Sequence, residues 1–261
     1  MMQDIATDGD FRFERSGEAC TVGRYNGRVA HVIVPTHHDG AVVTAIGRQA
    51  FAHYQALKSA SIPDTVTAIG DEAFYWCRGL EKVSIGSAVA AIGQKAFYCC
   101  DKLTQVSIGA SVKRIGTGAF FNCKMTELIL PDGLIEIAPN AFFACNRMQS
   151  LTVPDSVQTV GKGAFSACSA LERLTVGNSL ASIEQEVFSD CRSLRQVTLG
   201  RGVTRIAKDA FARCPRLTGA NFCEPNGWVV CDSEGEKAVD LSHAEAAARY
   251  LTSAAELRRN V

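Results

Sequence analysis

The sequence predicts an α/β repeat fold, a solenoid of short coils stacked along one axis. The dipeptide Ala-Phe recurs through most of the chain, and Val187-Phe188 fills its one gap. The steps between the eight phenylalanines, from Phe51 to Phe211, are 23, 23, 23, 22, 23, 23 and 23 residues. Such a period indicates stacked units that each bury an apolar face on their neighbours. The apolar positions within each unit, and the two ends where the period stops, support the same fold.

Each unit begins with a short predicted strand. Leu103, Val106 and Ile108 follow the spacing Leu-x-x-Val-x-Ile, which ends in the period of two of a strand with one buried face. A proline or glycine follows at once and ends the strand, because proline has no amide donor for a ladder and glycine favours turns. These residues are Pro63, Gly86, Gly109, Pro131, Pro154, Gly177 and Gly200.

The remainder of each unit returns the chain to the start of the next coil. The stretch Val-x-x-Ile-Gly, as in Val112 to Gly116, is predicted to cross the far side in an extended conformation. The stretch Ala-Phe-x-x-Cys, as in Ala119 to Cys123, is predicted to form one turn of α- or 3₁₀-helix that closes the coil. Its small alanine allows close approach of backbones, and its phenylalanine fills the interior.

The unit resembles the 23-residue bacterial variety of leucine-rich repeat called BspA-like. Residues Leu57 to Pro63, Val66, Ile69-Gly70 and Ala73 to Cys77 match that pattern, and six further units match it down to Cys214. The resemblance implies a right-handed leucine-rich-repeat solenoid with a parallel β-sheet on the concave face and short helical turns elsewhere. It also implies protein binding, since BspA-like proteins are typically bacterial or protist surface proteins that attach to host matrix proteins or to other cells.

Three parts are expected along the chain. They are a β-rich N-terminal cap with a first-coil insertion over residues 1–45, the solenoid over 46–223, and a C-terminal cap of a strand and a helix over 224–261. A solenoid needs caps because its end coils would otherwise expose their core.

The N-terminal part is predicted to be a small antiparallel meander. Three segments alternate between apolar and polar residues, and hairpin signals separate them. In chain order these are residues 11–15, Ser16-Gly17, 19–24, Asn26-Gly27 and 29–34.

The C-terminal part is predicted to cover the last coil. Trp228 to Val230 reads as one final strand, and Ser242 with Glu245 has the pattern of a capping box. Residues 244–259 are rich in helix-forming residues and are predicted to be helical. The apolar face of this helix is expected to pack on the last coil, and a partner-binding or dimerising helix is the alternative. That face consists of Ala247, Tyr250, Leu251, Ala254 and Leu257.

Seven of the eleven cysteines stand three residues after a repeat phenylalanine and form a column. Neighbouring coils stack about 4.8 Å apart, whereas the Cβ atoms of a disulfide lie about 3.8 Å apart in a specific torsion. A buried column of reduced thiols is therefore expected rather than a disulfide or metal framework, and it favours a reducing compartment. The column is Cys77, Cys100, Cys123, Cys145, Cys168, Cys191 and Cys214.

Charge and hydropathy exclude several classes of function. The chain has 27 basic and 27 acidic residues, and zero net charge argues against general binding to nucleic acid or to a membrane surface. No window of 18 apolar residues predicts a membrane span. Residues Met1 to Ala6 lack the basic and apolar regions of a secretion signal. A cytoplasmic location is expected, with the cell surface or secretion as the alternative if a signal has been removed.

The motifs of common enzymes are missing from the sequence. It contains no Gly-Lys-Ser/Thr phosphate loop, no Gly-x-Ser-x-Gly elbow and no His-Glu-x-x-His helix. His37, His38 and Asp39 are adjacent, but no third ligand stands at a suitable spacing for a metal. We expect neither enzymatic activity nor a cofactor or metal.

The residues expected to point outward from the strands form two polar columns. One column is serine and threonine with Ile129 as its apolar break, and the other, two residues earlier, has mixed charge. Such a ladder favours stacking of strands, and curved solenoids also bind through extended concave surfaces. The candidate binding residues of this face are Lys82, Gln105, Glu127, Ile129, Arg173 and Gln196.

A second candidate surface follows directly after the repeat phenylalanines. This position is aromatic in four successive coils and then becomes Ser166, Ser189 and Ala212. If the repeat phenylalanine points inward, this column is at least partly exposed, and exposed aromatic patches mark interaction sites. Packing against the turns of neighbouring coils is the alternative. With Trp76 added, this aromatic stripe consists of Tyr75, Trp76, Tyr98, Phe121 and Phe143.

Together these observations predict a monomeric, non-catalytic scaffold that binds a protein ligand. The resemblance favours a surface or adhesion protein. An intracellular adaptor, and an accessory or inhibitor subunit of a partner enzyme, are the alternatives.

Overall fold

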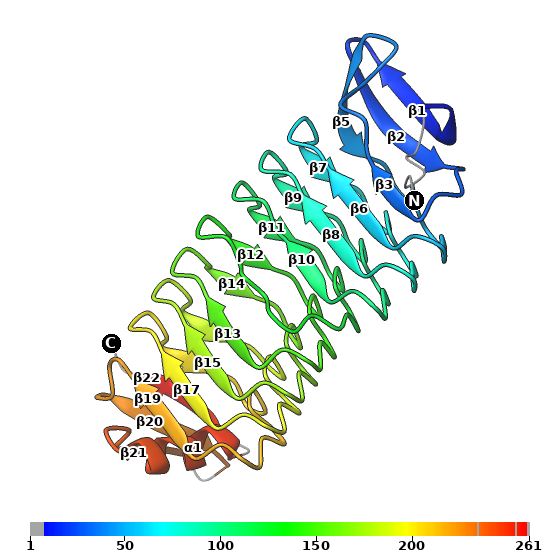
Figure 1. The fold of residues 1–261 in the computed structure, drawn as a ribbon. Helices are drawn as coiled ribbons and strands as arrows, with labels where there is room; N and C mark the ends of the chain where they lie inside the picture. Colours follow the sequence, from blue (N-terminus) through cyan, green and yellow to red (C-terminus); the bar gives the residue numbers. More distant parts are fainter. Residues whose placement is uncertain (1–7, 234, 254, 260–261) are drawn as a thin grey trace.

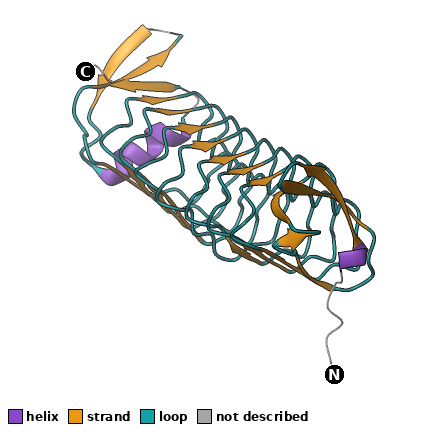
Figure 2. Cartoon of the chain, turned by 90° about the horizontal axis from the view of Figure 1, so that it is seen from above, coloured by secondary structure: helices purple, strands orange, loops and turns teal. Residues whose placement is uncertain are grey.

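The computed structural model describes residues 8–233, 235–253 and 255–259. They form an elongated β-solenoid of about nine turns, with an N-terminal hairpin and a C-terminal cap at opposite ends (Figure 1). Viewed from above, the coils follow one another along a single axis (Figure 2). The repeated solenoid predicted from the phenylalanine period is confirmed.

One side of the solenoid carries the longer strands, which we call the front sheet. One strand per coil pairs in parallel with its neighbour, as the Leu-x-x-Val-x-Ile spacing predicts. The coil between Cys123 and Pro131 contributes no strand, so the front sheet is divided into two groups of four. The first group is β3 (His31–Ile33), β6 (Ser59–Ile62), β8 (Lys82–Ile85) and β10 (Gln105–Ser107). The second is β13 (Ser150–Val153), β15 (Arg173–Val176), β17 (Gln196–Leu199) and β19 (Gly219–Phe222).

The other side carries mostly two-residue strands, which form the back sheet. These strands confirm that the Val-x-x-Ile stretch is extended, and most of them pair in parallel. A first run consists of β5 (Ala41–Ile46), β7 (Ala68–Ile69), β9 (Ala91–Ile92), β11 (Arg114–Ile115), β12 (Glu136–Ile137) and β14 (Thr159–Val160). A second consists of β16 (Ser182–Ile183) and β18 (Arg205–Ile206).

The Ala-Phe-x-x-Cys stretch is a series of tight turns, and the prediction of a helical turn there is wrong in detail. Glu72 and Trp76 have φ of 57° and 58°, and a residue in this left-handed region stops a right-handed helix. Amides alternate between partners: Tyr75 N donates to Glu72 O at 2.9 Å, and Phe74 N donates to Ala96 O of the next coil at 2.7 Å. Bonds between coils thus replace the bonds within a helix.

The repeat phenylalanines form the centre of the core. Their side chains are at most 1 % exposed from Phe51 to Phe211. Successive rings lie with centroids 4.7 to 5.7 Å apart and planes within 22° of parallel. The phenylalanine period therefore corresponds to one continuous stack of rings along the axis.

The N-terminal part differs from the predicted meander. After the short 3₁₀ helix η1 (Asp8–Asp10), β1 (Phe11–Ser16) and β2 (Ala19–Tyr25) form the expected hairpin. However, β3 pairs with β6 rather than β2, and β2 continues the back sheet beside β5. Parallel pairing with the solenoid is favoured because it extends both sheets, with β3 added to the front sheet and β2 to the back sheet. In the insertion, β4 (His37–His38) pairs antiparallel with β5, and the His38 ring stacks on Phe13 at 4.0 Å.

The C-terminal part also departs from expectation. Strands β20 (Trp228–Asp232) and β21 (Gly235–Val239) form a hairpin, and α1 (Ala244–Thr252) packs against β19. The predicted helix is too long, because β22 (Glu256–Arg259) is a strand that pairs antiparallel with β18 and β20. Pairing there covers the open edge of the back sheet.

Two further predictions about this helix are wrong. His243 rather than Ser242 occupies the N-cap, and its side chain makes no capping bond. On the predicted apolar face, Ala247 and Leu251 are buried on the helix, whereas Leu257 is buried from the strand. Tyr250 is half-buried, and Ala254 lies outside the described residues.

Candidate protein-binding faces

The outward residues of the front sheet lie in straight rows across the coils. Lys82 stands opposite Gln105 on the neighbouring strand, and Arg173 stands opposite Gln196. All four are exposed, as are Glu127 and Ile129 of the coil that lacks a strand. The structure thus places the six candidate residues of this polar face on one side of the molecule, in two groups separated by the interruption of the front sheet.

Charges on the polar face are solvated and weakly paired. On this face an ion pair joins Arg173 Nη1 to Glu172 Oε2 at 3.9 Å, with side chains 64% and 46% exposed. Exposed pairs of this kind contribute about 0–1 kcal/mol. These charges therefore stay available to an incoming partner.

The aromatic stripe is a second stack of rings outside the first. Tyr75 and Tyr98 have ring centroids 5.4 Å apart, Tyr98 and Phe121 4.5 Å, and Phe121 and Phe143 4.7 Å. All four side chains are half-buried, since each ring stacks on its neighbours and the stack stays partly exposed to solvent. The stripe combines both interpretations: the rings pack on neighbouring turns and still present an apolar surface.

The N-terminal end of the stripe broadens into a cluster. The Trp76 ring lies 6.0 Å from Tyr75, and the Arg78 guanidinium stands 4.1 Å from the centre of the indole. Such a cation–π contact contributes about 0.5–1 kcal/mol at an exposed site. His53 closes the end with its ring 5.5 Å from that of Tyr75.

The cysteine column lies inside the solenoid. Each Sγ donates to the carbonyl oxygen of the repeat phenylalanine one coil earlier, at 3.0 to 3.4 Å. All seven side chains are buried and carry free thiols. Burial raises the pKa of Cys77 and Cys168 to about 12, because a thiolate there would be desolvated.

Alkylation of the folded protein should separate these thiols from the rest. At pH 8 under reducing pretreatment, we expect iodoacetamide to modify the exposed Cys223 and to leave the seven column thiols unmodified. After denaturation all seven should react, as peptide mapping by mass spectrometry would record. Column thiols that are modified in the folded state, or blocked in denaturant without reductant, would contradict the buried-thiol interpretation.

The structure gives no metal or membrane-spanning feature in its described part. No group of three or more His, Cys, Asp or Glu side chains there could hold a metal ion. No helix among those residues has the length and apolar character to cross a bilayer.

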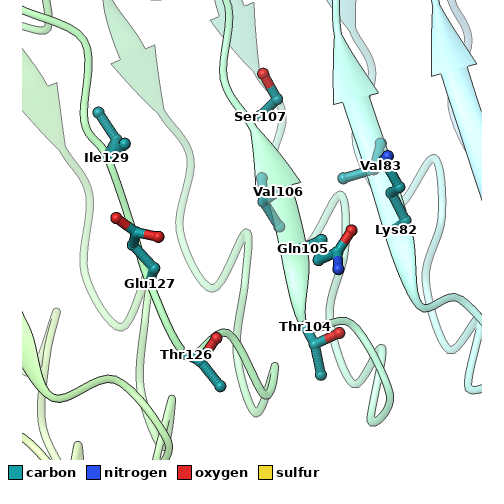
Figure 3. Close-up of a pocket in the computed structure, with 9 residues that line it drawn as sticks. All are labelled: Lys82, Val83, Thr104, Gln105, Val106, Ser107, Thr126, Glu127 and Ile129. Atoms are coloured by element: carbon teal, nitrogen blue, oxygen red, sulfur yellow. The ribbon is translucent and has the colours of Figure 1, made fainter.

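One feature of the polar face was not identified as a site from the sequence. A hollow of about 370 Å³ lies on the front sheet between β8 and the coil without a strand (Figure 3). Its lining includes Lys82, Gln105, Glu127 and Ile129. The single 22-residue step from Phe120 to Phe142 and the apolar break at Ile129 were the available signals.

A solenoid with parallel strands on two sides, a stacked phenylalanine in each coil and a front strand in most coils defines a leucine-rich-repeat protein. The chain belongs to the family of the BspA type leucine rich repeat region, which matches residues 44–125 and 113–227 in six copies. The resemblance of the repeat unit to this family is confirmed. Comparison with curated proteins finds no match.

Solved structures of bacterial proteins share the fold. A leucine rich cell surface protein from Faecalibacterium prausnitzii is 27% identical with a TM-score of 0.53, and the match covers 83% of this chain and 76% of that one. The leucine rich repeat protein of T. pallidum is 23% identical with a TM-score of 0.59, covering 82% and 91%. One from Bacteroides ovatus is 22% identical with a TM-score of 0.62, covering 85% and 72%. The latter two show similarity of fold alone.

Proposed function

We propose that the chain is a monomeric, non-catalytic scaffold that binds a protein partner through its outward ladders. The aromatic stripe carries the proposal. Its rings are held at fixed spacing by the coils, so binding would require little further ordering of these side chains. Rigid aromatic side chains with one solvent-facing edge are enriched at protein interfaces. The polar face adds solvated charges that can select a partner.

A role at the cell surface is the favoured form of this proposal. Membership of the BspA-type family and the likeness to the F. prausnitzii cell surface protein support it. An intracellular adaptor or an accessory subunit of an enzyme is the second candidate, and the reduced cysteine column favours it. Biotinylation of intact host cells separates the two, because only a surface protein is labelled before lysis.

Substitution of the stripe tests the binding role. We expect Tyr75→Ser, Tyr98→Ser and Phe121→Ser together to weaken capture of the protein partner at least tenfold, which is about 1.4 kcal/mol. Serine is compatible with the coil, since Ser166 and Ser189 occupy the same position in later coils. Affinity is measured by surface capture of the host protein that the wild-type chain retains.

The matched control changes a half-buried residue at the same coil position outside the stripe. Ala212→Ser should leave both capture and thermal unfolding unchanged. Capture that persists in the folded triple variant removes the stripe as a site. If no host protein is retained from either surface or lysate fractions, the scaffold function itself is wrong.

A further inference from the structure

The coil after β10 is one residue short, and the missing residue can be located. Cys123 is followed by one residue before the interior Met125, whereas Cys100 is followed by two before Leu103. The turn that leads into the front sheet is therefore shorter in this coil than in its neighbours. Here the chain enters the front sheet one residue early and forms no paired strand.

The short turn removes main-chain hydrogen bonds from this coil. In a regular coil, Thr104 N and Gln105 N both donate to Glu81 O, at 3.0 and 3.2 Å. Within the described residues, no main-chain bond joins 126–130 to β10 or to β13. The amides and carbonyls of this segment are thus left without ladder partners in the middle of the front sheet.

The interruption also exposes apolar surface. Ile129 is 73% exposed, the highest value among the large hydrophobic residues that the structure describes. Val106 and Ile108 are only partly buried, whereas Val83 and Ile85, their equivalents one coil earlier, are 1% and 3% exposed. A regular coil would cover these side chains.

Two hollows flank the segment from Glu127 to Ile129. The first, of about 370 Å³, has Val106 and Ile129 among its apolar lining. The second, of about 350 Å³, lies on the other side toward Ser150 and Thr152. A volume above 300 Å³ is within the range of ligand sites.

The walls of the first hollow carry opposite charges. Figure 3 shows Lys82 on one side of β10 and Glu127 on the other, with Ile129 beside Glu127. Neither charged side chain has an ion-pair partner within the part of the chain that the structure describes. They stand two coils apart, which is about 10 Å at the spacing of adjacent strands.

We propose that this short repeat is the docking point of the polar face for an extended segment of a partner protein. The segment lies across the strands, places an aliphatic side chain on Val106 and Ile129, and presents a carboxylate to Lys82 and a cation to Glu127. Alternate residues of an extended peptide face the same side. The carboxylate, the aliphatic side chain and the cation therefore belong to residues i, i+2 and i+4 of the segment. The inference rests on the proposed scaffold function and assigns the partner's chemistry.

The test uses the peptide acetyl-Asp-Thr-Leu-Thr-Lys-amide as the probe. Methyl NMR of the full chain should show saturable shifts of the Val106 and Ile129 methyl groups during titration. We expect affinity to fall at least fivefold when leucine in the peptide is replaced by serine or when the two charged residues are exchanged. Affinity should also fall with added salt, since the charges on both sides are solvent-exposed.

A variant with the missing residue restored should lose peptide binding while it gains main-chain hydrogen bonds in the front sheet. Insertion of an aspartate between Cys123 and Lys124 restores the spacing found at Cys100 to Leu103. We expect slower hydrogen exchange of the amides from residues 126–130 and at least tenfold weaker peptide binding. Loss of binding with a strengthened ladder cannot be attributed to unfolding.

A substitution pair guards against an insertion that fails to fold. Ile129→Thr restores the polar residue of the column and should weaken the peptide at least fivefold. Ile33→Thr is the matched control, because Ile33 is a 58% exposed isoleucine on β3, and it should change nothing.

Two results of the peptide titrations would overturn the inference. One is the absence of saturable shifts at Val106 and Ile129, and the other is equal peptide affinity in wild type, Ile129→Thr and the insertion variant. Wild-type affinity of the host partner for a folded insertion variant would likewise reject this docking point while the scaffold function stands. Failure of the wild-type chain to retain any host protein rejects the scaffold function instead.

Discussion

Phe120→Ala is expected to lower the free energy of unfolding by about 3–5 kcal/mol, as large-to-small changes of buried aromatic residues do. The Phe120 ring is fully buried between Phe97 and Phe142, at centroid distances of 5.0 and 5.3 Å. Its removal leaves a gap in the stack that the neighbouring coils cannot close, because main-chain bonds on both sides fix their separation. Urea unfolding at 25 °C followed by circular dichroism measures the change.

The adjacent ring supplies the control for this prediction. Phe121→Ala removes the same group from the half-buried stripe and should cost about 1–2 kcal/mol, since the lost side chain was already partly in solvent. Phe120→Leu, which keeps most of the volume, should fall between wild type and Phe120→Ala. A larger loss from Phe121→Ala than from Phe120→Ala would contradict the assignment of inner and outer stacks.

The architecture could be predicted because the same physical requirement repeats in every coil. An inward phenylalanine such as Phe74 and an inward thiol such as Cys77 recur at fixed spacing, and only a stacked coil buries them all. The same repetition identifies the outward positions, so the sequence alone predicts that Lys82 and Tyr75 lie on separate faces. Whether either face binds a partner stays a prediction.

What the sequence could not supply depends on contacts between distant segments. Residues 256–259 lie in a stretch with helical composition, yet they pair with β18 and β20, whose open edges local propensity does not reveal. The missing residue before Met125 is visible in the spacing. Its consequence is not, because a shortened turn could have been absorbed by the tight turns or by the back sheet, and β12 in fact keeps its pairing.

Stability should fall steeply at alkaline pH, and this is the second large effect. Burial holds the pKa of five column thiols above their ordinary value of 9.0, with Cys77 and Cys168 at about 12. Below pH 9 the thiols are protonated in both the folded and the unfolded chain, so their contribution is fully present. Above pH 9 the unfolded chain releases these protons and the folded chain retains them, so the free energy of unfolding falls until pH passes the folded pKa.

The size of this effect follows from the difference in protonation between the unfolded and the folded chain. At pH 10, one unit above the ordinary pKa, a thiol that stays protonated in the folded chain lowers the free energy of unfolding by about 1 kcal/mol. The raised pKa values of these five thiols all act in the same direction, and a loss of a few kcal/mol is a large part of the stability of an ordinary domain, about 5–15 kcal/mol. We therefore expect the melting temperature to fall between pH 9 and pH 10.5, measured by thermal melts in reductant.

Cys168→Ala separates the thiols from other groups that titrate in this range. Lysines and tyrosines contribute equally to wild type and variant, so the difference between the two pH profiles reports Cys168 alone. The variant is expected to be less stable at pH 7, because it loses the volume of the thiol and its bond to Phe142 O at 3.4 Å. Its deficit should shrink by about 1 kcal/mol between pH 8 and pH 10. Parallel profiles over that interval would show that the Cys168 thiol ionises as readily in the coil as in the unfolded chain, which its complete burial forbids.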